Sequence, residues 1–493
     1  MTKATARTGN GAVAYEHSED HLLEFFSKAG SLFKKKGTYY GNESTALELF
    51  KQAWRTGREE TCMKLAFWLR DFRASKSGSG AGNRSGARDI LNWLAHDESG
   101  KAWLKANIEK IPEYGRWDDL FALYNTDLES DAMLLWVDAI QNGNALAAKW
   151  ADAQDVKFRN FTGKSPKAFR KWIVNARKGK IVESLMCQKN WKEIDYSHVP
   201  SVAIGRYNKA FYKNDAERYD AWRKSLAEVN EDGTMEVVGD VKAGAIYPHD
   251  LVRTLMGASY GWYGSRVYYS PETEKLVEAQ FQSMPDYFDV TSRRIMPILD
   301  FSGSMYTRVS GSIEAIDVAL GLGLYCSDRV GKDNPFYRKV IPFSSNAKFA
   351  IWDKMTFAKA VEKIPDGYCG STNIKSALDL ILDSAKMWNL TQDQIPTCLC
   401  IISDMQWNEG VENSHTPIEN ALKRWTDAGF KKPQIVYWNL MGVKNQPATK
   451  FDKNVALVSG FSPSIMKAVL EGEDFTPMAI MTKTLEKYEV ITP

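Results

Sequence analysis

The spacing of apolar residues changes near residue 290 of this 493-residue chain. Before that point, large apolar side chains recur every three or four positions, which is the spacing of one helical face. The clearest examples are the stretches 21–33, 45–54, 60–72 and 88–96. Short segments with Gly or Pro, such as 110–117 and 244–251, are expected to be loops between helices. We therefore predict an all-helical region over residues 21–290, in which helix pairs stack on one another.

After residue 290 the pattern is different, because apolar β-type runs alternate with amphipathic stretches of helical length. The runs predict strands at 294–301, 337–345, 347–352, 397–405, 434–440 and 455–460, and helices at 313–328, 373–388 and 418–429. Strands that alternate with helices form a mostly parallel sheet covered on both faces. We therefore predict an α/β domain over residues 291–493, preceded by the helical region and by a flexible N-terminus over residues 1–20.

Composition narrows the class of protein. The chain is 44% hydrophobic and 25% charged, as in soluble globular proteins, and no segment approaches the roughly 20 apolar residues of a membrane span. The first residues contain no apolar run typical of a signal peptide. We therefore expect a cytoplasmic protein with no membrane partner. The net charge of +3 does not by itself indicate nucleic-acid binding, so the distribution of charge has to be considered.

The cysteines show no CxxC spacing, which argues against a zinc site and against a disulfide framework. They are Cys62, Cys187, Cys326, Cys369, Cys398 and Cys400. We expect reduced and mostly structural thiols.

The stretch IMPILDFSGSM, residues 295–305, reads as a buried strand that ends in an aspartate and two serines. Asp300, Ser302 and Ser304 are expected to lie in one tight loop, where Gly303 lets the backbone turn sharply. Short oxygen-bearing side chains in a concave loop suit a hard cation, because Mg²⁺ takes about six oxygen ligands.

Two more oxygen-bearing side chains occur in similar positions. Thr372 lies in a Gly-Ser-Thr loop that opens a helix, and Asp404 ends the strand predicted at 397–405. Ligands of parallel sheets bind beyond the carboxyl ends of the strands. We therefore predict a divalent-cation site, with Mg²⁺ as the expected ion, formed by Asp300, Ser302, Ser304, Thr372 and Asp404. One coordination position would remain for an acidic group of a partner.

Other interpretations of this loop stay open. Asp300 and Ser304 could cap the next helix, so that the loop would be structural. A nucleophilic serine lacks the G-x-S-x-G setting and a histidine nearby in the sequence, although a distant one such as His249 is not ruled out. No paired carboxylates, metal-ligand histidines or nucleophile–base spacing indicate catalysis, so we expect a protein that is not an enzyme.

Residues 156–180 carry nine basic side chains and no acidic one. The basic residues are Lys157, Arg159, Lys164, Lys167, Arg170, Lys171, Arg177, Lys178 and Lys180, interleaved with Phe158, Phe161, Phe169 and Trp172. Single-stranded nucleic acid binds such strips, because cations pair with phosphates and accessible rings stack on bases, at about 1–3 kcal/mol per base. The alternative is that the rings face the core and the charges are only solvated. We expect the rings in the core and the charges on a functional surface.

A second basic run, residues 69–89, surrounds a Gly/Ser loop. It contains Arg70, Arg73, Lys76, Arg84 and Arg88. Its backbone N–H groups and its cations could contact phosphates, and we include Arg84 and Arg88 among the predicted RNA-binding residues. The alternative is a flexible loop between two helices. The glycines do not form a Walker A motif, so nothing here indicates nucleotide hydrolysis.

The second part of the chain resembles a von Willebrand factor A domain with a metal-ion-dependent adhesion site, because the pattern D-x-S-x-S, then Thr, then Asp is complete in it. The resemblance implies a Rossmann-like α/β fold. It also implies that Ser302, Ser304 and Thr372 contact the metal directly, and that Asp300 and Asp404 do so directly or through water.

A helical region followed by such a domain is similar to the Ro autoantigen family, whose TROVE module is a ring of stacked HEAT-like helical repeats closed by that domain. The motifs FWLRDFR, IPEYGRWDDL, AIYPHDLV, LDFSGSM, ISDMQW and VYWNL are similar to those of uncharacterised Ro-like proteins. The resemblance implies a ring-forming helical region that binds small noncoding RNA, either structured Y-like RNA or single-stranded ends of misfolded RNA. The rival hypothesis is a protein–protein adaptor or assembly component that works through the metal site.

Overall fold

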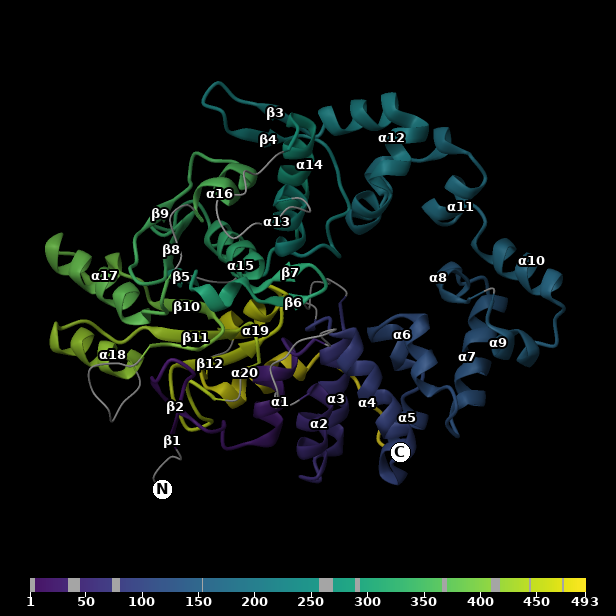
Figure 1. Cartoon of the computed structure of the whole chain (residues 1–493), viewed down its shortest axis with the longest axis horizontal. Coiled ribbons are helices and arrows are strands. Elements are labelled where there is room, and N and C mark those ends of the chain that lie inside the picture. Colours follow the sequence, from purple (N-terminus) through teal and green to yellow (C-terminus); the bar gives the residue numbers. More distant parts are fainter. Residues whose placement is uncertain are drawn as a thin grey trace.

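The computed structural model has a mostly helical first part and a C-terminal part built on a six-stranded sheet (Figure 1). It describes residues 5–33, 45–72, 80–152, 154–256, 269–288, 293–365, 370–408, 417–442, 445–471 and 474–493. Cys369 and the basic residues Arg73 and Lys76 lie outside these ranges.

The first four predicted helical stretches are confirmed as α1 to α4. The helices of this part are α1 (His21–Ala29), α2 (Ala46–Trp54), α3 (Glu59–Arg70), α4 (Arg84–His96), α5 (Glu98–Ala106), α6 (Lys110–Tyr114), α7 (Glu129–Gln141), α8 (Ala145–Trp150), α9 (Val156–Phe161), α10 (Pro166–Arg177), α11 (Val182–Cys187), α12 (Ser201–Lys224), α13 (Pro248–Met256) and α14 (Pro271–Gln282). Side-chain caps fix several starts, such as the capping box of Thr45 and Glu48 at α2.

Two segments expected to be loops contain helix instead. The stretch 110–117 includes the short helix α6, and α13 begins inside the stretch 244–251. Both prolines lie in the first turn of their helix, where a missing N–H costs no hydrogen bond. Proline therefore marks a helix start here rather than a loop.

The sheet confirms the predicted strands of the second part. They are β5 (Ile295–Asp300), β8 (Lys339–Phe343), β9 (Ala350–Ile351), β10 (Cys398–Ser403), β11 (Gln434–Asn439) and β12 (Val455–Ser459). The strand order is β12-β11-β10-β5-β8-β9, and only β9 pairs antiparallel. This is the doubly wound order, in which the strand sequence reverses between two central strands, here β5 and β10.

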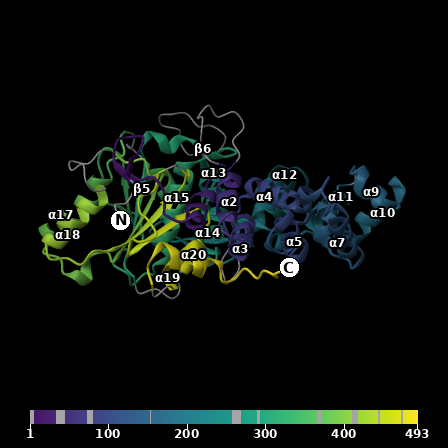
Figure 2. The same ribbon diagram turned by 90° about the horizontal axis from the view of Figure 1, so that it is seen from below.

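Helices cover the sheet as its pattern predicts. They are α15 (Ala315–Arg329), α16 (Phe357–Lys363), α17 (Ile374–Met387), α18 (Pro417–Asp427), α19 (Ile465–Glu471) and α20 (Pro477–Leu485). Helix α15 lies on one face, while α17 and α18 lie on the other (Figures 1 and 2). Helices α16, α19 and α20 were not predicted from the apolar pattern, because they are short.

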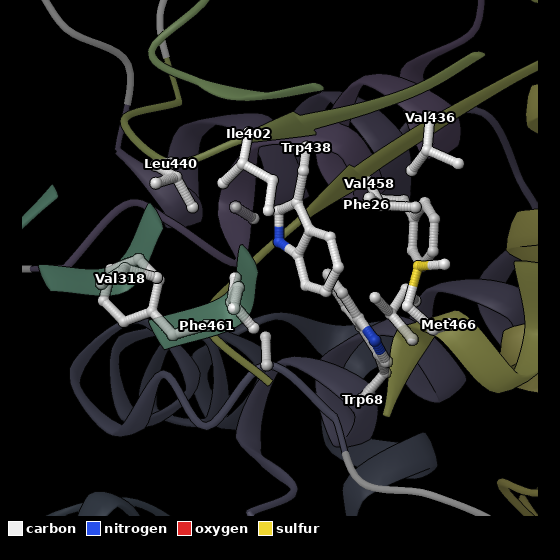
Figure 3. Packing of buried hydrophobic residues seen from close by; sticks show 14 of the residues in the cluster. Phe26, Trp68, Val318, Ile402, Val436, Trp438, Leu440, Val458, Phe461 and Met466 are labelled. Atoms are coloured by element: carbon white, nitrogen blue, oxygen red, sulfur yellow. The ribbon is translucent and has the colours of Figure 1, made fainter. Parts of the chain in front are cut away.

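One hydrophobic core extends across the predicted boundary at residue 290. It includes buried residues from Ala12 to Tyr488. Trp68 of α3 packs against Phe26 of α1, with ring centroids 4.7 Å apart, and lies beside Trp438 of β11 and Met466 of α19 (Figure 3). The boundary therefore marks a change of secondary structure but does not separate two cores.

The helical part meets the sheet part at both of its ends. At the first end, α1 contacts β12 and α3 contacts α20. At the second end, α13 packs on α15 and α14 on α16. The approach of α13 requires glycine in α15, because a Cβ on Gly321 would lie 2.8 Å from the backbone nitrogen of His249. The intervening helices therefore form an arc that leaves the sheet part and returns to it (Figure 1).

The segment expected to be a flexible N-terminus instead contains a hairpin within residues 5–15. Its strands are β1 (Thr5–Arg7) and β2 (Val13–Tyr15). Tyr15 and Gln446 exchange two backbone hydrogen bonds of 2.9 and 2.8 Å, and Ala12 is fully buried. The Asn10-Gly11 pair, with positive φ at Gly11, is typical of a hairpin turn. The expectation was wrong for these residues because their partners come from the other end of the chain.

Two expectations from composition can be compared with the described residues. None of the helices within them combines the length and apolar character needed to cross a bilayer. The described cysteines are free thiols, buried at Cys62, Cys326, Cys398 and Cys400 and exposed at Cys187.

Candidate metal centre and cationic surface

The sheet places two aspartates side by side at its switch point. Asp300 is the last residue of β5, and Asp404 directly follows the neighbouring parallel strand β10. Asp300 is 0% and Asp404 1% exposed. Ligands of doubly wound sheets bind at this point, beyond the carboxyl ends of the strands.

Two serine hydroxyls accompany these carboxylates. Ser302 Oγ and Ser304 Oγ lie 3.2 Å apart, and the Ser304 side chain hydrogen-bonds Asp404. Adjacent oxygens of an octahedral Mg²⁺ shell lie about 2.9 Å apart, given metal–oxygen distances of about 2.05 Å. Ser302 is buried whereas Ser304 is exposed, so the site opens on the side of Ser304.

Thr372 reaches the same region through its loop. The N–H of Gly303 donates to the carbonyl of Gly370, at 3.2 Å, which joins this loop to the serine loop. Thr372 and Asn408 exchange two hydrogen bonds, at 3.0 and 3.3 Å, which join it to the segment after Asp404. The three predicted loops therefore adjoin one another, with Thr372 tied to the other two through backbone bonds.

The helix-capping interpretation of the serine loop is wrong. Helix α15 begins at Ala315 with Glu314 as its N-cap residue, so neither Asp300 nor Ser304 caps it. Gly303 also differs from expectation, because its φ is not positive and a Cβ there would meet no atom within 4 Å. The left-handed residue of the site is instead Met405, with φ of 62° directly after Asp404. A non-glycine residue in this conformation is uncommon and is often found at functional sites.

The carboxylates are buried without a basic partner. Asp300 accepts hydrogen bonds from the N–H of Ser302 at 2.9 Å and from the Ser403 hydroxyl at 2.6 Å. Burial, and then the charge of Asp404, raises the pKa of Asp300 to about 7 despite these bonds. Burial also raises the pKa of Asp404, against hydrogen bonds from Ser304 and from the N–H of Gln406. Within the described ranges, no Lys, Arg or His forms an ion pair with either carboxylate.

The described residues contain no group of three or more His, Cys, Asp or Glu side chains that could hold a metal ion. The predicted cation site instead combines two carboxylates with three hydroxyl groups. His249 does not make a serine nucleophilic, because it stacks on Tyr247 at 5.4 Å and its buried Nδ1 has no hydrogen-bond partner. Burial lowers the pKa of this histidine.

The basic residues at 156–180 form α9, α10 and the residues that flank them. Phe158 and Phe169 are fully buried, as expected, and Trp172 is partly buried. Phe161 is an exception, with 40% of its surface exposed. Val174 of α10 is also exposed, at 45%. The surface of these two helices therefore presents cations together with some apolar groups.

The cations of this surface are mostly unpaired. Lys157 forms an ion pair with Glu129, at 2.6 Å, and Lys180 donates to the carbonyl of Gly143. No other member of the strip forms an ion pair with a described residue, and Lys167, Arg170, Lys171 and Lys178 are exposed. Helices α9 and α10 lie at the end of the arc farthest from the sheet (Figures 1 and 2). We call α9, α10 and residues 178–180 the cationic strip.

In the second basic run, one of the two predicted RNA-binding arginines already has internal carboxylate partners. Arg88 lies 2.7 Å from Asp119 and 2.9 Å from Asp118, and Arg70 lies 2.7 Å from Asp119. Arg88 therefore neutralises internal carboxylates and is not free to bind phosphate. Arg84 is exposed, and its prediction remains untested.

Two sets of residues at the candidate metal centre were not predicted from the sequence. Ser403, which donates to Asp300, directly precedes Asp404, so its place at the strand end was a usable signal. The hairpin turn at residues 8–11 also contacts the site loops. It lies hundreds of residues away along the chain, and no local pattern indicates this contact.

The chain is similar to two protein-family models, to a viral protein and to a solved structure. Residues 294–490 match a family described as "Domain of unknown function (DUF7788)", and residues 154–289 match "Domain of unknown function (DUF2828)". The chain is 25% identical to "Uncharacterized protein L728" of Acanthamoeba polyphaga mimivirus, over 99% of this chain and 88% of that protein. It is also similar to the crystal structure of the Deinococcus radiodurans Ro (RSR) protein, at 15% identity, over 96% of this chain and 100% of that one. The TM-score of 0.39 is too low to establish a shared fold.

Proposed function

We propose that this chain is a non-enzymatic, Ro-like RNA-binding protein of the cytoplasm, which binds small noncoding or misfolded RNA through the cationic strip. The observation that carries this proposal is the set of exposed cations on α10 and at Lys178, which form no ion pair with a described residue. Cations that serve only solubility are usually interspersed with acidic residues, whereas this strip contains none. The motifs shared with Ro-like proteins support the same partner class.

Single-stranded RNA suits this surface better than a duplex. Phe161 is exposed and Trp172 partly exposed, so that stacking on unpaired bases can accompany phosphate contacts. Lys164 already lies over the Trp172 ring, 5.2 Å from its centroid. Because α10 lies at the end of the arc farthest from the sheet, both structured RNA and single-stranded ends can approach it (Figure 1).

The proposal includes a divalent-cation site at the switch point of the sheet. The donor set fits a hard cation, because two buried carboxylates lie beside hydroxyls and form no ion pair with a basic residue that the structure describes. The side chains that would contact Mg²⁺ directly are those of Ser302, Ser304 and Thr372. Asp300 and Asp404 would contact the ion directly or through water. The bound ion supplies positive charge for a partner carboxylate that approaches from the side of Ser304.

A protein–protein adaptor is the second candidate function, and the opening of the site at Ser304 favours it. In that case a partner's acidic residue is captured at the cation site, and RNA association is negligible. The two functions differ in which surface is required, so that one pair of variants separates them.

The test is filter binding of a fluorescent single-stranded RNA to the full chain over a range of salt concentrations. A plot of the logarithm of wild-type affinity against the logarithm of salt concentration should have a slope of about −0.7 for each phosphate neutralised. The variant with Lys167, Arg170, Lys171 and Lys178 all changed to Glu should lose more than about tenfold in affinity and flatten that slope by up to about 3. The loss should be similar for unrelated RNA sequences.

A matched control carries the same change of charge elsewhere. Lys332, Lys386, Lys431 and Lys453 are exposed on the sheet part, and changing all four to Glu should leave most of the affinity. Equal losses in the two variants would mean that only overall charge matters. RNA affinity that is absent in wild type, combined with partner capture that Asp300→Ala abolishes, would support the adaptor instead.

A further inference from the structure

The turn of the N-terminal hairpin lies against the segment that follows Asp404. The Thr8 hydroxyl donates to the carbonyl of Trp407, and the N–H of Gly9 donates to the side-chain carbonyl of Gln406, each at 2.6 Å. Gly11 then pairs with Asn408 as an antiparallel bridge. The turn therefore adds an outer layer to the loop that carries one of the two site carboxylates.

Asn10 extends this contact to the second loop of the site. Its Nδ2 group donates to the carbonyl of Gln406 at 2.6 Å and to the Thr372 hydroxyl at 3.4 Å. The Gln406 carbonyl can only accept, so the amide nitrogen of Asn10 has to face this way. The orientation of the Asn10 side chain is therefore set by its surroundings.

This contact bears on the coordinating ability of Thr372. A threonine hydroxyl has two lone pairs and one proton. A hydrogen bond from Asn10 occupies one lone pair and leaves the other for a cation. Partners behind a metal ligand orient it and tune its affinity for the metal.

The hairpin does not need this contact to stay in place. Its second strand exchanges two backbone hydrogen bonds with Gln446, and the Asn445 side chain donates to the carbonyl of Arg7. Tyr15 also donates to Glu419 at 3.1 Å. These anchors do not involve Asn10. The contacts of the turn with the site loops can therefore be changed while the anchors of the hairpin remain.

We propose that Asn10 is a positioning residue of the cation site, and that the hairpin is a clasp whose docking is coupled to cation binding. The proposal rests on the cation site proposed above. Because coupling between two binding events is reciprocal, the cation strengthens docking of the hairpin by the factor by which the hairpin strengthens cation binding. The cation site then depends on residues from both ends of the chain.

The first experiment measures the affinity of the full chain for Mn²⁺ by electron paramagnetic resonance. Asn10→Ala should weaken Mn²⁺ binding by about tenfold, the lower end of the range for residues behind a metal ligand. Asn10→Gln, which keeps the amide, should recover part of that affinity. The control Asn92→Ala removes an amide that donates to the carbonyl of Ala122 within the helical part and should bind Mn²⁺ as wild type does.

The second experiment follows trypsin cleavage after Arg7, which is exposed. Saturating Mn²⁺ should slow this cleavage in wild type, and Asn10→Ala should remove most of the protection. If wild type binds no Mn²⁺ at all, the cation site itself is wrong. If wild type binds Mn²⁺ but Asn10→Ala binds it equally and cleavage ignores the ion, the site stands and the clasp is overturned.

Discussion

Two pairs of neighbouring aspartates have different surroundings. Asp118 and Asp119 lie among Arg70, Arg88 and Arg116, with nitrogen–oxygen distances between 2.7 and 3.1 Å. Asp300 and Asp404 have only hydroxyl and backbone partners, and no basic side chain in the described ranges pairs with them.

The difference lies in whether described residues compensate the charge of the aspartates. The first pair is compensated inside the chain, so its role is to tie α3, α4 and the turn at Trp117–Leu123 together. Gly115 permits this approach, because a Cβ there would lie 2.5 Å from Asp119 Oδ2. The second pair has no basic partner among the described residues, and uncompensated buried charge is costly. The divalent cation proposed above would compensate it.

The largest effect is expected when the ion pairs of Asp119 are broken. Asp119→Ala leaves Arg70 and Arg88 without their shared carboxylate and should lower the free energy of unfolding by about 3–5 kcal/mol. Urea denaturation of the full chain measures this loss. Asp127→Ala, which removes an exposed carboxylate paired with Lys101, should cause no measurable change. Equal effects in the two variants would show that Asp119 is not structurally special.

The second prediction concerns the uncompensated pair. Mg²⁺ at about 100 times its dissociation constant should raise the free energy of unfolding by about 2.7 kcal/mol. Asp300→Asn should abolish this increase, because it removes one of the two charges that attract the ion. Thermal unfolding with Mg²⁺ or with a chelator measures the increment. Asp119→Asn serves as a control that should keep the full increment, and an increment retained by Asp300→Asn would contradict the site.

A third prediction uses a buried carboxylate that belongs to neither pair. Glu278 of α14 accepts from the N–H of Phe357 at 2.8 Å and from Gln282 at 3.1 Å. Burial raises the pKa of Glu278 despite these bonds. The folded state therefore binds more protons than the unfolded state just above the ordinary glutamate pKa of about 4.3, and stability falls as pH rises through that window.

The variant Glu278→Gln removes this titration. Its free energy of unfolding should improve relative to wild type as pH rises from about 5 to about 7. Urea denaturation at several pH values gives the difference between the two proteins, in which the other titrating groups cancel. A difference that does not change with pH would show that the Glu278 carboxyl has an ordinary pKa.

The smallest effect is expected on the cationic strip. Glu129→Gln breaks the ion pair between Glu129, whose side chain is 23% exposed, and Lys157, whose side chain is 48% exposed. The substitution should change the free energy of unfolding by under about 1 kcal/mol. The same substitution frees Lys157 for phosphate and should slightly raise RNA affinity in filter binding. A fall in RNA affinity would place the RNA surface elsewhere.

The sequence was most informative where a signal is local. The apolar pattern gave the six strands of the sheet, because a buried parallel strand needs a continuous apolar run. It also indicated where the strands end in Asp300 and Asp404. Patterns of this kind failed for α6, where Pro112 in a first turn was taken as part of a loop.

Partners far apart along the chain could not be found in this way. Arg88 was predicted to bind phosphate, because nothing near it in the sequence shows that Asp119 lies beside it. The hairpin at residues 5–15 was expected to be flexible, because its contacts with Gln446 and Asn408 join opposite ends of the chain.

The sequence by itself determined most of the longer helices and the strands of the main sheet, which strand ends carry oxygen donors, and where basic residues gather. These properties depend on residues a few positions apart. Only the tertiary structure decided which charges are compensated, since Asp119 meets its arginines and Asp300 meets no basic side chain among the described residues. Charge compensation depends on distances between separate elements, and these distances are set by the packing of the whole core.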